Sequence, residues 1–341
     1  MRRTLYYLPL ALLLISTGSQ LLGRSSLSPS AEPASRPEMQ RYSYSRFQMG
    51  TQFDLTFYAS SPEEAARAST AALDRIEELE EILSSWREES ELMEMLGSAH
   101  EKPIVVSDEL FRVLERSQEI SRLTSGAFDI TIRPLVELWQ KSRRQEKLPA
   151  REQIQAARSV TGFEKVLLNP RTRSVRLREP GVQIDLGGVG KGFAGDEVLK
   201  RLAESGIERA LLNAGGDVRL GAPPPGKQGW RISLGSPGQT DPIVLYLKNC
   251  AVATSGDLFQ FVEIDGVRYS HILDPESGVG LTHRGSVTVL APDGVTADAL
   301  ATAFSVLPIE RGMSIAGRME GVQIRVTRLI DGVQESRASP G

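Results

Sequence analysis

The stretch of residues 182–196, VQIDLGGVGKGFAGD, constrains the fold of this chain most, because it runs from a short apolar strand through several glycines into a helix. Glycines let backbone amides approach an anion closely, and a helix N-terminus adds unpaired N–H groups, to which Lys191 would add a full charge. A P-loop is excluded, since that motif requires a glycine in place of Asp185 and a hydroxyl in place of Gly192. Two interpretations stay open: a phosphate-binding turn, or a tight strand-to-helix turn with a solvent-facing lysine.

The composition bounds the size of the core and the class of partner. A chain of 341 residues with 40% hydrophobic residues can bury a large core, as one elaborate domain or two smaller ones. The formal net charge of −3 gives no support for nucleic-acid binding, so an anionic substrate has to be met by a local site. Cys250 is the only cysteine, which excludes an intramolecular disulfide, and it is interpreted as a small core residue.

The N-terminal residues carry the signature of export. Residues 1–22 combine two arginines with an apolar run, which is typical of a secretory signal peptide or of an uncleaved membrane anchor. Residues 23–41 are rich in Ser, Pro and Ala and predict a flexible linker. The folded domain is expected at residues 42–330 and a disordered tail at residues 331–341. We therefore expect a periplasmic or other extracytoplasmic protein, with or without an anchor in the inner membrane.

The order of strand and helix patterns indicates the fold class. Residues 61–86 predict a helix with Ser61 as N-cap, and residues 108–124 and 296–306 predict two more. The expected strands are residues 47–59, 230–234, 243–247, 251–254, 259–264 and 286–290, and Asp265-Gly266 is a predicted hairpin turn. Because strands and helices do not alternate strictly, the sequence predicts an α+β fold.

A second segment with chemical content lies in the predicted helix at residues 296–306. Asp298 and Thr302 are four residues apart and therefore share one face of the helix. A carboxylate and a hydroxyl are hard oxygen ligands that suit Mg²⁺, which takes few protein ligands and completes its shell with waters and substrate phosphates. The alternative is that Asp298 decorates a surface helix and that Thr302 is incidental.

His271 lies at the end of a predicted strand, before an Asp-Pro turn that would project it into a cleft. A neutral imidazole can take a proton from a hydroxyl nucleophile, whereas the alternative role is an orienting hydrogen bond inside the turn. Two further glycine turns, at residues 213–217 and 254–257, could line the same cleft, and residues 126–131 expose a carboxylate after a helix. The sequence contains no zinc pattern, no GxSxG elbow and no Cys-His pair.

Taken in order, these pieces resemble the ApbE family of flavin transferases. The matching motifs span approximately residues 47–326 and are Met49-Gly-Thr51, Leu83-Ser-Ser-Trp86 with Ser90-Glu-Leu92, Gly126-Ala-Phe-Asp129-Ile-Thr131 with Pro134-Leu135, Ile184-Asp-Leu-Gly-Gly-Val-Gly-Lys-Gly192, Asn213-Ala-Gly-Gly-Asp217, Thr254-Ser-Gly-Asp257, His271-Ile-Leu-Asp-Pro275 and Ala297-Asp298 with Thr302. The chain departs from the family pattern at four positions, with Trp86 in place of a tyrosine, Gly190 in place of an alanine, Leu258 in place of an aromatic residue and Ser277 in place of a threonine.

The resemblance implies a body of mixed, largely antiparallel strands packed with helices around a dinucleotide cleft. It further implies that FAD is contacted by eight residues, Met49, Trp86, Ala127, Phe128, Asp129, Asp185, Lys191 and Ile272. An indole at residue 86 stacks on a flavin or adenine ring as a phenol does. The implied magnesium site combines Asp298, Thr302 and the backbone carbonyl of Gly188.

The activity that the resemblance implies is Mg²⁺-dependent transfer of FMN from FAD onto a Ser or Thr hydroxyl of an exported or membrane flavoprotein, with release of AMP. His271 is the candidate general base, and Asp257 is the second candidate. Two alternatives use the same site. One is a Mg²⁺-dependent FAD pyrophosphatase, in which water replaces the protein hydroxyl, and the other is a non-catalytic flavin-binding protein.

Overall fold

The computed structural model describes residues 38–235, 242–257, 260–330 and 333–339. The compact folded unit begins at Met39. The predicted signal or anchor at residues 1–22, and most of the predicted linker, lie outside the described residues. None of the helices in the described part of the chain is long and apolar enough to span a membrane.

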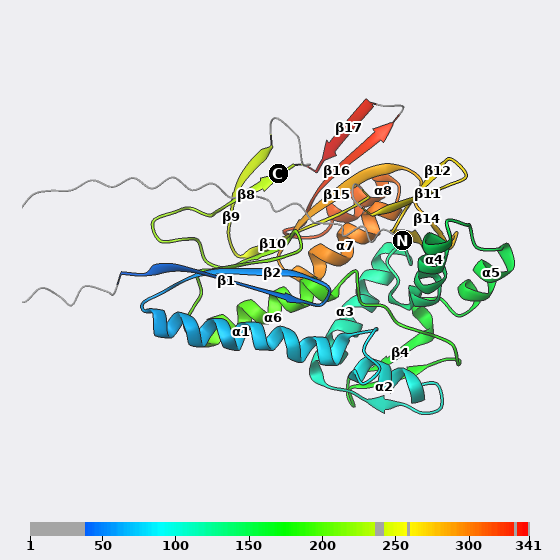
Figure 1. Cartoon of the computed structure of the whole chain (residues 1–341), viewed down its shortest axis with the longest axis horizontal. Coiled ribbons are helices and arrows are strands. Elements are labelled where there is room, and N and C mark those ends of the chain that lie inside the picture. Colours follow the sequence, from blue (N-terminus) through cyan, green and yellow to red (C-terminus); the bar gives the residue numbers. More distant parts are fainter. Residues whose placement is uncertain (1–37, 236–241, 258–259, 331–332, 340–341) are drawn as a thin grey trace, which may run out of the picture. The chain divides into compact units, whose positions relative to one another are not determined.

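An eight-stranded antiparallel sheet forms the centre of the unit (Figure 1). Its strands, in spatial order, are β1 (Gln40–Gln48), β2 (Thr51–Ala59), β6 (Ala210–Ala214), β7 (Asp217–Leu220), β10 (Cys250–Gly256), β15 (Arg284–Ala291), β16 (Gln323–Ile330) and β17 (Val333–Ala338). Smaller antiparallel sheets join β3 (Ile104–Val105), β5 (Ser174–Leu177) and β4 (Val166–Asn169), β8 (Trp230–Leu234) and β9 (Ile243–Leu247), β11 (Phe261–Ile264) and β12 (Val267–Ser270), and β13 (Leu273–Asp274) and β14 (Val279–Gly280). The predicted α+β class and the largely antiparallel pairing are confirmed.

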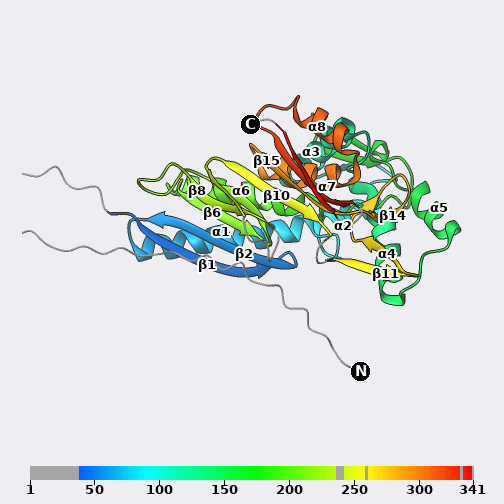
Figure 2. The ribbon, with the colours of Figure 1, turned by 90° about the horizontal axis from the view of Figure 1, so that it is seen from above.

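Helices pack against the sheet, and α1, α6 and α7 lie next to one another in this layer. The helices are α1 (Pro62–Leu83), α2 (Glu91–Ser98), α3 (Asp108–Thr124), α4 (Arg133–Gln145), α5 (Arg151–Ser159), α6 (Gly190–Glu204), α7 (Gly294–Val306) and α8 (Ile309–Ala316), with 3-10 turns η1 (Ile130–Ile132) and η2 (Phe163–Lys165). Helix α6 packs between α1 and α7 against the sheet (Figures 1 and 2). Helix α7 is buried on almost all sides, and its first residue, Gly294, lets the backbone of α6 approach closely. The candidate ligand Asp298, which is 5% exposed, therefore lies inside the unit, which excludes the interpretation of α7 as a surface helix.

The predicted elements match the structure closely, with two differences. The strand expected at residues 47–59 is a hairpin, because Met49 and Gly50 adopt positive φ angles of 47° and 73° and turn the chain between β1 and β2. The disordered tail expected from residue 331 is wrong for residues 333–338, which form β17 and pair with β16. β17 was missed because its polar composition lacks the apolar alternation of a strand, and pairing through the backbone does not require it.

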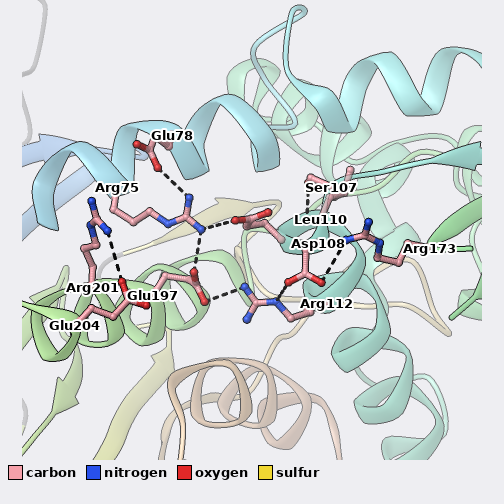
Figure 3. A network of polar contacts seen from close by, with 11 residues as sticks. Arg75, Glu78, Ser107, Asp108, Leu110, Arg112, Arg173, Glu197, Arg201 and Glu204 are labelled. Atoms are coloured by element: carbon pink, nitrogen blue, oxygen red, sulfur yellow. Dashed lines mark hydrogen bonds and ion pairs between the residues drawn. The ribbon is translucent and has the colours of Figure 1, made fainter. Parts of the chain in front are cut away.

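A network of ion pairs ties α6 to α1 and α3 (Figure 3). Glu197 of α6, whose side chain is only 6% exposed, accepts from Arg75 at 2.9 Å and from Arg112 at 3.0 Å. Arg75 also pairs with Glu109 at 2.6 Å. Burial alone would raise the pKa of Glu197, but the hydrogen bonds from the two guanidinium groups outweigh burial and lower it. Glu197 is therefore ionised, and it joins three helices at one point.

We expect the substitution Glu197→Gln to lower the free energy of unfolding by about 2 kcal/mol, because it removes a buried carboxylate charge from two guanidinium groups. The loss is limited because Arg75 keeps its pairs with Glu78 and Glu109, and Arg112 keeps its pair with Asp108. The lowered pKa means that this stabilisation is present above the ordinary glutamate pKa and is lost as the pH falls through the lowered value. Urea unfolding at neutral and acidic pH should therefore show a difference between wild type and variant that shrinks in acid. The matched control is Glu204→Gln on the same helix, whose exposed pair with Arg201 should change stability by less than about 0.5 kcal/mol.

Candidate functional site

Lys191 lies at the start of α6 between two carboxylates. Its Nζ is 2.8 Å from Asp217 Oδ2 and 3.3 Å from both carboxylate oxygens of Asp298. Burial alone would lower the pKa of Lys191, but the two carboxylates outweigh it and raise the pKa above the ordinary lysine value. The lysine therefore stays charged and points into the molecule, which excludes the interpretation of a solvent-facing lysine at a simple turn.

Asp298 lies one turn inside α7, with a side chain that is 7% exposed. Burial raises the pKa of its carboxyl group to about 6, Lys191 opposes this rise, and the charge of Asp217 adds to it. The backbone N–H of Gly192 donates to Asp298 Oδ2 at 3.1 Å. The predicted glycine turn and the predicted ligand helix thus meet at this one carboxylate.

The three residues predicted to bind Mg²⁺ lie together. Thr302 Oγ1 donates to the backbone oxygen of Asp298 at 3.2 Å. A Cβ atom built on Gly188 would lie 3.2 Å from Thr302 Oγ1, so the glycine loop runs directly over the threonine. The described residues contain no group of three or more His, Cys, Asp or Glu side chains that could hold a metal. One carboxylate, one hydroxyl and one carbonyl oxygen are nevertheless a set that fits Mg²⁺, because this ion is commonly bound by one or two carboxylates together with waters and substrate phosphates.

Met49 and Phe128 contact the same loop. A Cβ atom on Gly190 would lie 3.5 Å from Met49 Cε, and one on Gly188 would lie 3.3 Å from the ring of Phe128. The first distance is an ordinary contact, so the loop has room for the alanine that is usual at residue 190. Phe128 is 4% exposed and belongs to the core, whereas Ala127 is half-buried. Met49 and Phe128 therefore pack against the glycine loop beside the predicted ligands, and direct contact of these side chains and of Ala127 with FAD stays a prediction.

Asp129 has a structural role that sequence reasoning missed. Its Oδ1 accepts from the backbone N–H and the hydroxyl of Thr131 at 2.8 and 2.6 Å, and its Oδ2 accepts from the N–H of Phe163 at 2.8 Å. Burial raises the pKa of Asp129, and these hydrogen bonds counter the rise. The carboxylate joins the turn after α3 to η2, and its proposed contact with FAD stays a prediction.

Trp86 lies beside Arg133, and Asp185 hydrogen-bonds within the glycine turn. The Trp86 side chain is 58% exposed, and the Arg133 guanidinium carbon lies 5.3 Å from the centre of its ring. Asp185 Oδ1 accepts from the N–H of Gly187 at 2.6 Å, which fixes the backbone at the start of the glycine turn. Burial raises the pKa of Asp185, while the charge of Arg133 lowers it. The exposed indole is therefore available for stacking, and Arg133 lies near its ring.

One ring nitrogen of His271 hydrogen-bonds to the backbone. Its Nδ1 is 3.1 Å from the carbonyl oxygen of Gln260, so Nδ1 is the protonated nitrogen of the neutral ring and Nε2 is the acceptor. Burial lowers the pKa of His271, and the positive charges of Arg143 and Lys191 lower it further. The orienting hydrogen bond and the basic nitrogen thus occur in the same ring, so the two roles considered for His271 are compatible.

Asp257 and Ile272, the other predicted site residues near His271, are both held by local contacts. The carboxylate of Asp257 accepts from the N–H of Gly285 at 3.0 Å and lies 3.2 Å from Arg268 Nε. Ile272 is 8% exposed and its N–H donates to Ser270 Oγ at 3.0 Å. Asp257 is therefore held in an ion pair, which makes His271 the better candidate for the base.

Sequence reasoning did not assign a role to Asp217, although the structure places it against Lys191. Gly215 and Gly216 adopt positive φ angles of 62° and 108° and turn the chain from β6 into β7, where Asp217 is the first residue. The second oxygen of its carboxylate accepts from the N–H of Thr254 at 3.1 Å. The glycine turn of residues 213–217 marked Asp217 as a polar residue at a strand end. Its ion-pair partner Lys191 lies 26 residues earlier in the chain and is brought near only by the fold.

Comparisons with known proteins agree with this architecture. The model of the ApbE family matches residues 49–326. The FAD:protein FMN transferase of Vibrio cholerae serotype O1 is 33% identical over 298 residues, covering 85% of this chain and 89% of that protein. The protein of the same name from Klebsiella pneumoniae is 32% identical and covers 88% and 94%.

Solved structures show the same fold. The flavin transferase ApbE from Vibrio cholerae superposes with a TM-score of 0.80 at 30% identity, covering 89% of this chain and 98% of that chain. The ApbE protein from Thermotoga maritima superposes with a TM-score of 0.76 at 33% identity, covering 87% and 96%. Both the family model and these relatives extend over most of the described residues, and the chain therefore belongs to the ApbE family.

Proposed function

We propose that this protein is a Mg²⁺-dependent FAD:protein FMN transferase that joins FMN to a Ser or Thr hydroxyl of an acceptor flavoprotein and releases AMP. The observation that carries the proposal is the junction of Lys191, Asp217 and Asp298 beside Thr302 and Gly188, in a chain whose relatives bear this name. A charged lysine beside a hard-oxygen ligand set suits a pyrophosphate.

The proposed reaction displaces AMP from FAD. The oxygen of the acceptor hydroxyl attacks the phosphorus of the FMN half, the bond from that phosphorus to the bridging oxygen breaks, and AMP leaves with the bridging oxygen. The hydroxyl proton passes to Nε2 of His271, which is the unprotonated nitrogen. Lys191 remains protonated and stabilises the charge that grows on the departing phosphate.

Asp298, Thr302 and the carbonyl oxygen of Gly188 are the residues that would hold Mg²⁺. The ion would neutralise the pyrophosphate and stabilise the leaving group. The hydrogen bond from the N–H of Thr254 to Asp217 Oδ1 holds the Asp217 carboxylate in place. Lys191 would therefore keep a carboxylate partner when Asp298 binds the ion.

We also propose that the acceptor lies outside the cytoplasm. The support is the export signature of residues 1–22, which would place this site in the periplasm or at the outer face of the inner membrane.

The test is mass spectrometry of the purified protein incubated with FAD, Mg²⁺ and candidate exported flavoprotein acceptors. The expected result is an FMN adduct on an acceptor Ser or Thr with an equal amount of AMP, and a chelator should abolish both. Free FMN and AMP without an adduct on any acceptor would indicate the pyrophosphatase instead. FAD that binds and stays intact would indicate a binding protein.

The pH profile tests His271. Because its pKa is lowered, the ring stays neutral as the pH falls to the ordinary histidine value, and kcat/KM should decline only below about pH 6.5. His271→Asn should lower kcat by about 10²-fold to 10⁴-fold, leave the KM for FAD unchanged and remove this acidic limb. The matched control is His283→Asn, since His283 is another histidine with a burial-lowered pKa and contacts Ser305 O at 3.1 Å. An unchanged kcat and profile in His271→Asn would exclude the base assignment.

A further inference from the structure

The two helices that carry the candidate site touch backbone to backbone. Lys191 and Gly192 open α6, while α7 begins at Gly294 and carries Asp298 one turn later. A Cβ atom on Gly192 would lie 2.1 Å from the carbonyl oxygen of Gly294, and one on Gly294 would lie 2.3 Å from that of Gly192. At such a contact a small slide of one helix along the other would change the distance between Lys191 and Asp298.

Asp196 of α6 holds the N-terminus of α7 at this contact. Both of its carboxylate oxygens lie 2.9 Å from the N–H of Gly294, and Oδ2 also accepts from the N–H of Val295 at 3.1 Å. The N-cap of α7 itself, Asp293, accepts from Thr296 at 2.7 Å. Asp196 therefore satisfies the two helix N–H groups that the local cap does not reach, and it does so from another helix.

Asp196 also connects α7 to the central sheet. Arg219 Nε of β7 donates to Asp196 Oδ1 at 2.6 Å. Two residues earlier on the same strand, Asp217 pairs with Lys191. Burial raises the pKa of Asp196, and Arg219 and the helix N–H groups counter this rise. One carboxylate thus joins α6, α7 and β7, the three elements that supply Lys191, Asp298 and Asp217.

The neighbouring carboxylate on α6 has a different set of partners. Glu197 pairs with Arg75 of α1 and Arg112 of α3 on another side of the helix (Figure 3). Those partners hold the outer helices and none of them contacts Lys191 or Asp298. Glu197 is therefore a matched control for the removal of a paired carboxylate from α6.

We propose that Asp196 is the positioning residue of the site, because it fixes α7 against α6 and β7 and so sets the geometry between Lys191 and Asp298. It acts through the N-terminus of α7 and not by touching FAD. The inference rests on the proposed function for its kinetic consequence, whereas its structural consequence is independent of that function.

The test compares Asp196→Ala, Asp196→Asn and Glu197→Gln in the complete protein. Amide hydrogen exchange without FAD or metal should be about fivefold to tenfold faster for the peptide at residues 293–300 in Asp196→Ala, the size expected for a lost helix cap. Asp196→Asn keeps one acceptor oxygen and should fall between wild type and Asp196→Ala. Glu197→Gln should lower overall stability without a selective effect on this peptide.

The kinetic readout is the Mg²⁺ concentration that gives half-maximal FMN transfer. It should rise about tenfold in Asp196→Ala and less in Asp196→Asn, and should stay at the wild-type value in Glu197→Gln. The inference is overturned if Asp196→Ala matches Glu197→Gln in both readouts, and Asp196→Asn decides the question if the alanine variant does not fold. If the wild type transfers no FMN, the proposed function fails, and the exchange data alone then decide the role of Asp196.

Discussion

Replacing Asp298 with alanine is expected to lower FMN transfer by about a thousandfold and to abolish its response to Mg²⁺. The carboxylate is the only negatively charged group in the proposed ligand set, and Thr302 and the Gly188 carbonyl cannot replace its charge. The loss of preorganised charge stabilisation at a phosphoryl group is commonly worth several kcal/mol. The measurement is a Mg²⁺ titration of FMN transfer, with adduct and AMP quantified separately.

The variant should fold, because Lys191 keeps its shorter ion pair with Asp217 at 2.8 Å. Asp298→Asn is the matched control for shape, since an amide oxygen can still accept from Gly192 while the negative charge is lost. Both variants should therefore lose Mg²⁺-dependent transfer while keeping the wild-type unfolding temperature to within a few degrees. Full Mg²⁺-dependent turnover by Asp298→Ala would remove Asp298 from the metal site.

The second large effect is expected for Gly192→Ala, which should destabilise the protein by about 3 kcal/mol or more and disable the site. The added Cβ would lie 2.1 Å from the carbonyl oxygen of Gly294 and 2.4 Å from its carbonyl carbon. Both atoms belong to the backbone, so the clash is relieved only if α6 and α7 separate. Separation would also break the hydrogen bond from Gly192 to Asp298, and chemical denaturation together with transfer assays would measure both losses.

Gly97→Ala is the control for the general cost of adding a methyl group to a helical glycine. Gly97 lies in α2, and a Cβ atom there would meet no heavy atom within 4 Å. Alanine at this exposed position should stabilise the protein by about 0.5–1 kcal/mol because it has the higher helix propensity. Equal stability of Gly192→Ala and wild type would mean that the two helices do not meet as closely as described.

Local patterns in the sequence were sufficient for most elements. The cap of α1 is Ser61, which accepts from the N–H of Glu64 as expected, and Asp265-Gly266 does join β11 to β12. The hairpin at Met49 was missed because a non-glycine residue with positive φ carries no strong local signal. The strand β17 was missed because an edge strand can be polar on both faces when its backbone is paired.

The site was only partly accessible to the same reasoning. The spacing of Asp298 and Thr302 placed both on one face of a helix, and the structure keeps them there. Asp129 shows the limit: its bond to Thr131 is local and could have been predicted, whereas its bond to Phe163 joins residues 34 apart. Asp217 and Asp196 likewise depend on partners that no local pattern identifies.

The sequence by itself determined the elements of this protein and the face on which each chemical group lies, because hydrogen bonding and side-chain periodicity within a helix or strand depend only on near neighbours. The tertiary structure alone decided that Lys191 meets Asp217 and Asp298, and that Asp196 caps a helix other than its own. Those contacts join segments far apart in the chain. They form only when the packing of α6 and α7 against the sheet brings the segments together and shields their charges from water.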